Sequence, residues 1–97
     1  MNDDEVLQAL KAVIDPELGV NIVDLGLVYR AERQPGGIEV AVTLSTPSCP
    51  LSEMLIEEAR EALRARFVDA PAIRVELVWD PPWTPDRMSE AARSRLS

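Results

Sequence analysis

The chain has 97 residues, enough for a single domain that spans residues 1–97. Its 17 acidic and 10 basic residues give a net charge of −7, whereas nucleic-acid-binding proteins need a cationic surface to neutralise phosphates. The sequence contains no histidine and one cysteine, which excludes an internal disulfide and a closed zinc site of Cys and His ligands within one chain. We therefore expect a binding or carrier protein that is not a classical enzyme and does not bind nucleic acid.

Nothing in the sequence predicts a membrane location. No apolar stretch approaches the length of a transmembrane helix. Three of the first five residues are acidic and none is basic, whereas a secretory signal begins with a basic region. We predict a cytoplasmic protein.

The first predicted element is a helix over about residues 3–14, capped by Asn2 or Asp3 and ended by Pro16 and Gly19. Its apolar residues have the spacing of one helix face: Val6, Leu7, Leu10, Val13 and Ile14. Residues 15–24 are predicted to form a loop with some extended backbone.

Two antiparallel strands are predicted next, over about residues 26–33 and from residue 38 to residue 45. The Pro35-Gly36-Gly37 sequence between them is typical of a hairpin. The second strand has the clearest alternation, because apolar side chains occupy every second position: Ile38, Val40, Val42 and Leu44.

A rigid turn is predicted at residues 46–50, followed by a helix over about residues 51–66 whose first helical residue is Pro50 or Leu51. The buried stripe of this helix is predicted to contain Leu51, Leu55, Ala59, Ala62 and Leu63. A third strand follows over about residues 72–80, and the two prolines after it end the strand because they lack an N–H. Thr84 is expected to cap a last helix that begins at Pro85. The predicted order is α-β-β-α-β-α, an α+β fold in which helices cover a three-stranded sheet in a two-layer sandwich.

Cys49 is the first candidate functional residue. With Pro50 as the first helical residue, Cys49 is the N-cap, where unpaired N–H groups and the helix dipole favour the nucleophilic, metal-binding thiolate. Ser45 and Thr46 supply hydroxyls that could hydrogen-bond a sulfur or a ligand. The alternative is a structural Cys49 that acts as a small buried hydrophobe.

Two further segments are candidates. Asp15, Glu17 and Asp24 place three carboxylates in one loop, where they could orient a partner, move a proton or bind a metal, or simply form turns. The second segment runs from Trp79 through Asp80 to Trp83 and is either a docking surface or a stiff strand exit with Trp79 in the core.

Four sequence blocks together resemble the iron–sulfur cluster assembly domain family, which includes SufT-like and PaaD-like proteins and the related eukaryotic cytosolic targeting factor. The blocks are residues 15–18 (DPEL), 21–29 (NIVDLGLVY), 43–50 (TLSTPSCP) and 78–85 (VWDPPWTP). The resemblance implies that Cys49 matches the family's functional cysteine and that Asp15, Glu17 and Thr46 match polar positions near it. Ser45 stands where a second threonine is common, and Ser48 where glycine is common.

We therefore interpret the chain as an accessory protein in iron–sulfur cluster assembly, transfer or targeting to client apoproteins. Cys49 would transiently bind iron or a cluster, shared with a carrier, a scaffold or a second copy of the chain, because such clusters normally take four cysteine ligands. The alternative is an interaction adaptor, for example for a multicomponent oxygenase, with a structural cysteine.

Overall fold

A computed structural model describes residues 3–15, 18–44 and 52–96 of the chain. In these ranges the elements are α1 (Asp4–Leu10), β1 (Val28–Gln34), β2 (Gly37–Val42), α2 (Ser52–Arg66), β3 (Ile73–Leu77), the 3₁₀ helix η1 (Pro85–Arg87) and α3 (Glu90–Leu96). The strand order is β1-β2-β3, with β1 antiparallel and β3 parallel to β2. The predicted α+β fold and element order are confirmed.

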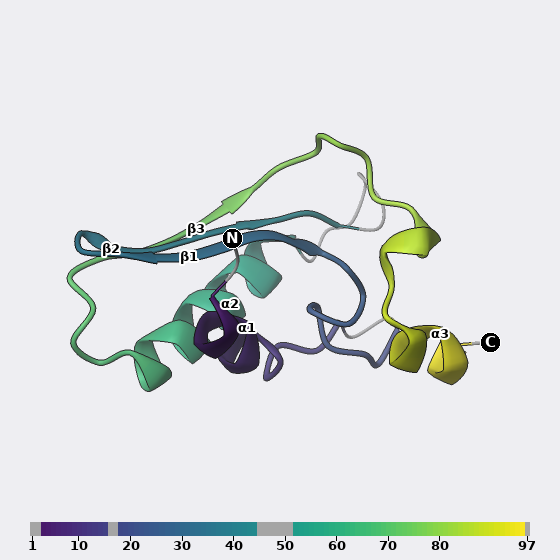
Figure 1. Cartoon of the computed structure of the whole chain (residues 1–97), viewed down its shortest axis with the longest axis horizontal. Helices are drawn as coiled ribbons and strands as arrows, with labels where there is room; N and C mark the ends of the chain where they lie inside the picture. Colours follow the sequence, from purple (N-terminus) through teal and green to yellow (C-terminus); the bar gives the residue numbers. More distant parts are fainter. Residues whose placement is uncertain (1–2, 16–17, 45–51, 97) are drawn as a thin grey trace.

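The hydrophobic core lies between the sheet and helices α1 and α2, which cover the same face of the sheet (Figure 1). The predicted inner face of β2 is buried, and three residues of the predicted α2 stripe are buried too, namely Leu55, Ala59 and Leu63. From α1, Val6 and Leu10 are fully buried against them. Ala62 is half-buried, and Leu51 lies outside the described residues. No helix in the described ranges is long and apolar enough to cross a membrane.

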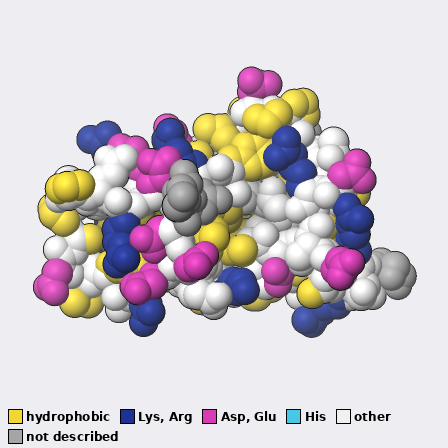
Figure 2. All heavy atoms as spheres, viewed as in Figure 1, with side chains coloured by type: hydrophobic (Ala, Val, Ile, Leu, Met, Phe, Trp, Pro, Cys, Tyr) yellow, Lys and Arg dark blue, Asp and Glu magenta, His cyan; other side chains and the backbone are white. Residues whose placement is uncertain are grey.

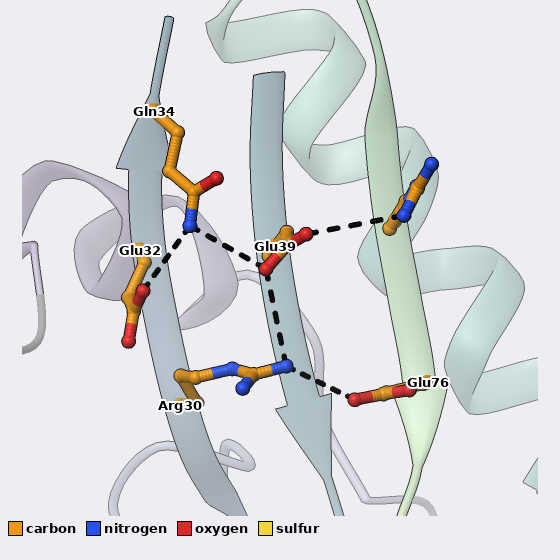
Figure 3. Close-up of polar contacts among 6 residues, drawn as sticks. Arg30, Glu32, Gln34, Glu39 and Glu76 are labelled. Carbon is orange, nitrogen blue, oxygen red and sulfur yellow. Dashed lines mark hydrogen bonds and ion pairs between the residues drawn. The ribbon is translucent and has the colours of Figure 1, made fainter. Parts of the chain in front are cut away.

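The opposite face of the sheet carries a network of charged side chains (Figure 3). Arg30 on β1 and Glu76 on β3 form an ion pair of 3.0 Å across β2. Ala41 of β2 lies between them in the strand register, and only 5% of its surface is exposed. Glu39 lies two residues before Ala41 in β2, and its carboxylate oxygens lie 4.0 Å from a guanidinium nitrogen of Arg30 and 3.9 Å from one of Arg74.

Helix α1 is shorter than predicted, because it ends at Leu10 and not at Ile14. The backbone beyond it pairs with the following loop: the N–H of Ile22 donates to the carbonyl oxygen of Val13 at 3.0 Å, and Ile14 forms a bridge with Asn21. These backbone groups are then unavailable for helical hydrogen bonds. Ile14 is 45% exposed as a result, so it does not share the buried side of Val6 and Leu10, as the predicted common helix face required.

The strands also differ at their ends from the predicted ranges. Gly26 has a φ of +77° in a turn, so β1 begins two residues later, at Val28. Its register with β2 shifts between Val28 and Arg30, which leaves Tyr29 as an extra residue in a bulge. Strand β3 ends at Leu77, although the N–H of Val78 still donates to Val42 at 2.8 Å.

The last helix does not begin at Pro85. Thr84 makes no side-chain capping hydrogen bond, only a 3₁₀ turn follows it, and Met88 returns to extended backbone. The cap of α3 is Ser89, whose Oγ accepts from the N–H of Ala92 at 3.2 Å. Helix α3 therefore lies beyond the end of the sheet (Figure 1), where Ala92 joins the core.

Candidate functional site

The structure describes Asp15, Asp24, Trp79, Asp80 and Trp83 among the predicted site residues. Four others lie outside the described residues: Glu17, Ser45, Thr46 and Cys49. The predicted grouping of Asp15 and Glu17 with Cys49 therefore remains a prediction. The described candidate residues lie in the loop after α1 and in the segment after β3.

Asp15 is almost fully buried, with 6% of its surface exposed. Its Oδ1 accepts from the N–H of Leu18 at 3.3 Å. Its carbonyl oxygen accepts from Gly19 at 2.7 Å, and its N–H donates to Val20 at 3.0 Å. Gly19 has a φ of +69°, which favours glycine in this turn. The structure thus supports the turn-forming role of Asp15.

Asp24 is tied to both the loop and the C-terminal segment. Its Oδ2 accepts from the side-chain amide of Asn21 at 2.8 Å, and its own N–H donates to the Asn21 Oδ1 at 2.9 Å. Its carbonyl oxygen accepts from the N–H of Ser89 at 2.7 Å. The carboxylate is thus held by a side-chain amide. The sequence analysis missed Asn21, although an Asn three residues before an Asp is a known local turn signal.

The segment after β3 is fastened onto the loop that precedes β1. The indole N–H of Trp83 donates to the carbonyl oxygen of Leu25 at 2.7 Å, and the Tyr29 hydroxyl donates to the Pro81 carbonyl oxygen at 2.7 Å. The Arg87 guanidinium lies 4.7 Å from the centroid of the Tyr29 ring, in a cation–π contact. The sequence analysis did not identify Tyr29 as a candidate. The feature that could have indicated it is its aromatic side chain within residues 21–29, one of the four blocks that resemble the family.

Gly26 allows this segment to approach closely. A Cβ at this position would overlap the backbone carbonyl of Arg87. A larger residue would therefore push the C-terminal segment away from the loop, in addition to the strain of a positive φ.

Trp79 and Trp83 differ in their surroundings. Trp79 lies beyond the end of β3 and is 44% exposed, so the alternative that placed it in the core is wrong. Asp80 is also exposed, whereas Trp83 is half-buried and packs against the core. Figure 2 shows hydrophobic side chains gathered over this segment, at the top of the view.

Thr43 is a polar residue directly after the end of β2. It is 1% exposed, and its Oγ1 has no hydrogen-bond partner in the described structure. Leaving a buried hydroxyl unpaired costs about 1–3 kcal/mol. Thr43 precedes Ser45 by two residues, so an unsatisfied hydroxyl lies next to the segment that carries Cys49 in the sequence. The described ranges contain no group of three or more Cys, Asp or Glu side chains able to hold a metal.

The family model described as "Iron-sulfur cluster assembly protein" matches residues 3–72, which include the Asp15 loop, both antiparallel strands, the Cys49 segment and α2. The chain belongs to the iron–sulfur cluster assembly protein family. The resemblance inferred from the four sequence blocks is thereby confirmed.

Curated relatives within this family are similar over nearly the whole chain. The Fe-S protein maturation auxiliary factor YitW of Bacillus subtilis is 40% identical over 97 residues, which cover 96% of this chain and 91% of the relative. The auxiliary factor SufT of Staphylococcus aureus is 41% identical over 85 residues, covering 87% and 96%. A crystal structure of a domain of unknown function, DUF59, from Bacillus anthracis superposes with a TM-score of 0.91 at 35% identity, covering 96% of this chain and 89% of that one.

Proposed function

We propose that this protein is a non-enzymatic accessory factor in iron–sulfur cluster assembly, transfer or targeting to client apoproteins. The observation that carries the proposal is the similarity over almost the full length of both chains to relatives named Fe-S protein maturation auxiliary factors. The whole chain, residues 1–97, would act as one domain in the cytoplasm. Its partners would be cluster carriers or scaffolds and the client proteins.

The chemical centre of this proposal is the Cys49 thiolate. It is the only thiol in the chain, and soft thiolate ligands suit iron–sulfur chemistry. A single thiolate cannot replace the four cysteine ligands that such clusters normally take. The cluster would therefore be cargo, held transiently between Cys49 and ligands from a carrier, a client or a second copy of this chain.

The described residues would support the Cys49 centre by keeping the loop before β1 and the C-terminal segment in place. Asp15 and Asp24 order the loop before β1 through the contacts given above, and Trp83 and Tyr29 fasten the C-terminal segment to it. The Thr43 hydroxyl, buried and without a partner in the described structure, would be available to Ser45, Thr46 or a bound sulfur. Glu17 would add a third carboxylate to the same loop.

The test is anaerobic reconstitution with iron and sulfide, followed by absorption spectroscopy and size measurement. The monomer should hold no stable cluster. Cluster absorption should accompany a dimer or a complex with a carrier, and Cys49→Ala should abolish it. Met54→Ala is the matched control, because it also removes a sulfur-containing side chain. Met54 is 42% exposed, and we expect cluster binding not to need it. A cluster retained by Cys49→Ala would contradict the proposed role of the thiol.

The same variants can be examined in cells. Cys49→Ala should lower the activity of iron–sulfur client enzymes, whereas Met54→Ala should not. Affinity capture from the native host with wild-type protein and Cys49→Ser should identify partners whose binding depends on the thiol. Normal client activity in Cys49→Ala cells would reject a thiol-based mechanism.

A second candidate function is a protein-interaction adaptor with a structural cysteine. It is favoured by the exposure of Trp79, which is followed in the chain by the exposed residues Asp80, Pro81 and Pro82. Exposed tryptophans are frequent at the energetic centres of interfaces. Trp79→Ala should then abolish client maturation while Cys49→Ala leaves it intact. Trp83→Ala is a poorer probe of docking, because Trp83 also holds the loop at Leu25.

A further inference from the structure

Strand β3 forms an open edge of the sheet. In a parallel ladder, the N–H and the C=O of one residue both point to the same neighbouring strand, and those of the next residue both point to the opposite side. The carbonyl oxygen of Ala72 and the N–H of Val78 both bond to β2, at 2.9 and 2.8 Å, so the even-numbered residues of β3 face β2. The backbone groups of Ile73, Val75 and Leu77 consequently point away from the sheet, and the described structure gives them no hydrogen-bond partner.

The other edge of the sheet is different, because the start of α1 covers part of it. The N–H of Asp3 donates to the carbonyl oxygen of Ala31 in β1 at 2.7 Å. Arg33 of β1 also contacts Asp3 at 3.1 Å and Glu5 at 3.4 Å. An added strand would have to displace these contacts at β1, whereas β3 is free of them.

The sequence of β3 is complementary to itself in the antiparallel direction. We propose that a second copy of this chain pairs with β3 through its own β3, about a two-fold axis at Val75, to make one continuous sheet. In this register Val75 faces Val75 of the second copy, and Ile73 faces Leu77. These are the residues whose backbone groups point outward, so each facing pair can exchange both of its hydrogen bonds.

Charge complementarity supports this occupant and this register. Arg74 lies opposite Glu76 of the second copy, and Glu76 opposite Arg74, in the non-hydrogen-bonded pairs where side chains approach most closely. Both side chains are accessible, with 79% of Arg74 and 60% of Glu76 exposed. The new ion pairs would join the Arg30–Glu76 and Glu39–Arg74 contacts (Figure 3) into one network across two sheets.

The expected association is weak. Strand β3 has five residues, and pairing two such short edges buries less than the roughly 1,200–2,000 Å² of a standard stable interface. Each cross-strand ion pair adds only about 0.2–1 kcal/mol. We therefore expect a reversible dimer that forms at high protein concentration.

The test uses charge reversal and sedimentation equilibrium at about 0.15 M salt, where charges farther apart than about 8 Å are largely screened. Arg74→Glu places a glutamate opposite Glu76 of the second copy, and Glu76→Arg places an arginine opposite Arg74, so each single variant should remain monomeric where wild type dimerises. An equimolar mixture of the two variants restores opposite charges in every facing pair and should dimerise. Glu32→Arg, which makes the same charge change on β1, should dimerise like wild type.

Amide hydrogen exchange supplies the second measurement. The N–H groups of Ile73, Val75 and Leu77 should become protected as the wild-type concentration rises, and the Arg74→Glu variant should show no such increase. A protein that stays monomeric up to about 1 mM would overturn the proposal. So would a dimer that both single variants retain, or a mixture that fails to associate.

Discussion

The indole N–H of Trp83 donates a 2.7 Å hydrogen bond to the carbonyl oxygen of Leu25, across 58 residues of sequence. This contact joins the segment after β3 to the loop that carries Asp15 and Asp24. The Tyr29–Pro81 and Asp24–Ser89 hydrogen bonds flank it. The C-terminal segment therefore holds the loop in place.

Trp83→Ala should lower the free energy of unfolding by about 2–4 kcal/mol, because it removes a half-buried aromatic side chain and leaves the Leu25 carbonyl without its donor. Trp83→Phe keeps most of the ring and should cost about 1–2 kcal/mol. Urea denaturation measures both. Trp79→Ala is the control and should cost about 1 kcal/mol or less, since Trp79 is 44% exposed. A larger loss for Trp79→Ala than for Trp83→Ala would contradict this account.

Gly26→Ala should destabilise the protein by more than Gly19→Ala. Both glycines have a positive φ, +77° and +69°, so either alanine costs about 1–2 kcal/mol of backbone strain. At Gly19 a Cβ would meet nothing within 4 Å, whereas at Gly26 it would overlap the carbonyl of Arg87. Thermal unfolding of the two variants gives the comparison. Equal losses at the two positions would mean that the close approach of Arg87 does not matter.

Asp3 should make the stability of the folded chain depend on pH in the acid range. Its carboxylate accepts from the N–H groups of Glu5 and Val6 at 2.9 and 3.1 Å. The hydrogen bond from the Val6 N–H has the largest effect and lowers the pKa of Asp3 below its ordinary value, and the positive charge of Arg33 also lowers it. The ionised form is thus favoured in the folded state, so this stabilisation is fully present above the unfolded pKa, about 3.9, and is lost as the pH falls through the folded pKa.

Asp3→Asn is the variant that tests this prediction, because asparagine keeps a capping oxygen but does not titrate. The unfolding free energies of wild type and variant in denaturant should differ most above about pH 5, and the difference should shrink below about pH 4. Asp86→Asn is the control, since the side chain of Asp86 is 96% exposed. A difference between wild type and Asp3→Asn that stays constant from neutral pH to about pH 3 would count against the cap.

The Cys49 thiol should react with iodoacetamide in the folded protein, and faster than a free cysteine at neutral pH. The reason is the predicted position at a helix N-terminus, where the dipole and unpaired N–H groups favour the thiolate. Alkylation rates followed by mass spectrometry, with and without denaturant, measure it. A thiol that reacts only after denaturation would support the alternative of a buried structural cysteine.

Much of the fold followed from local patterns. Alternation at Ile38, Val40 and Val42 and the helical spacing of Leu55, Ala59 and Leu63 predicted the inner faces of β2 and α2 correctly, because burial on one face of a regular element leaves its period in the sequence. For the candidate site, the four blocks resembling a known family indicated the functional class and singled out Cys49. Their resemblance also implied that Asp15 lies near Cys49, and this placement remains a prediction.

Other features depend on contacts between distant segments, which leave no periodic signal. The end of α1 is decided by backbone pairing of Val13 and Ile14 with residues of the next loop. The start of α3 is decided where Ser89 both caps the helix and donates to Asp24.

The sequence by itself determined the element order, the inner faces of β2 and α2, and the family. The tertiary structure alone decided which tryptophan is anchored and which is exposed. It also decided that Ala41 is buried beneath an ion pair and that the edge of β3 is open. The physical reason is that burial and hydrogen-bond partners are set by which distant segments meet, as when Trp83 reaches Leu25, whereas helix and strand periods are set by near neighbours in the chain.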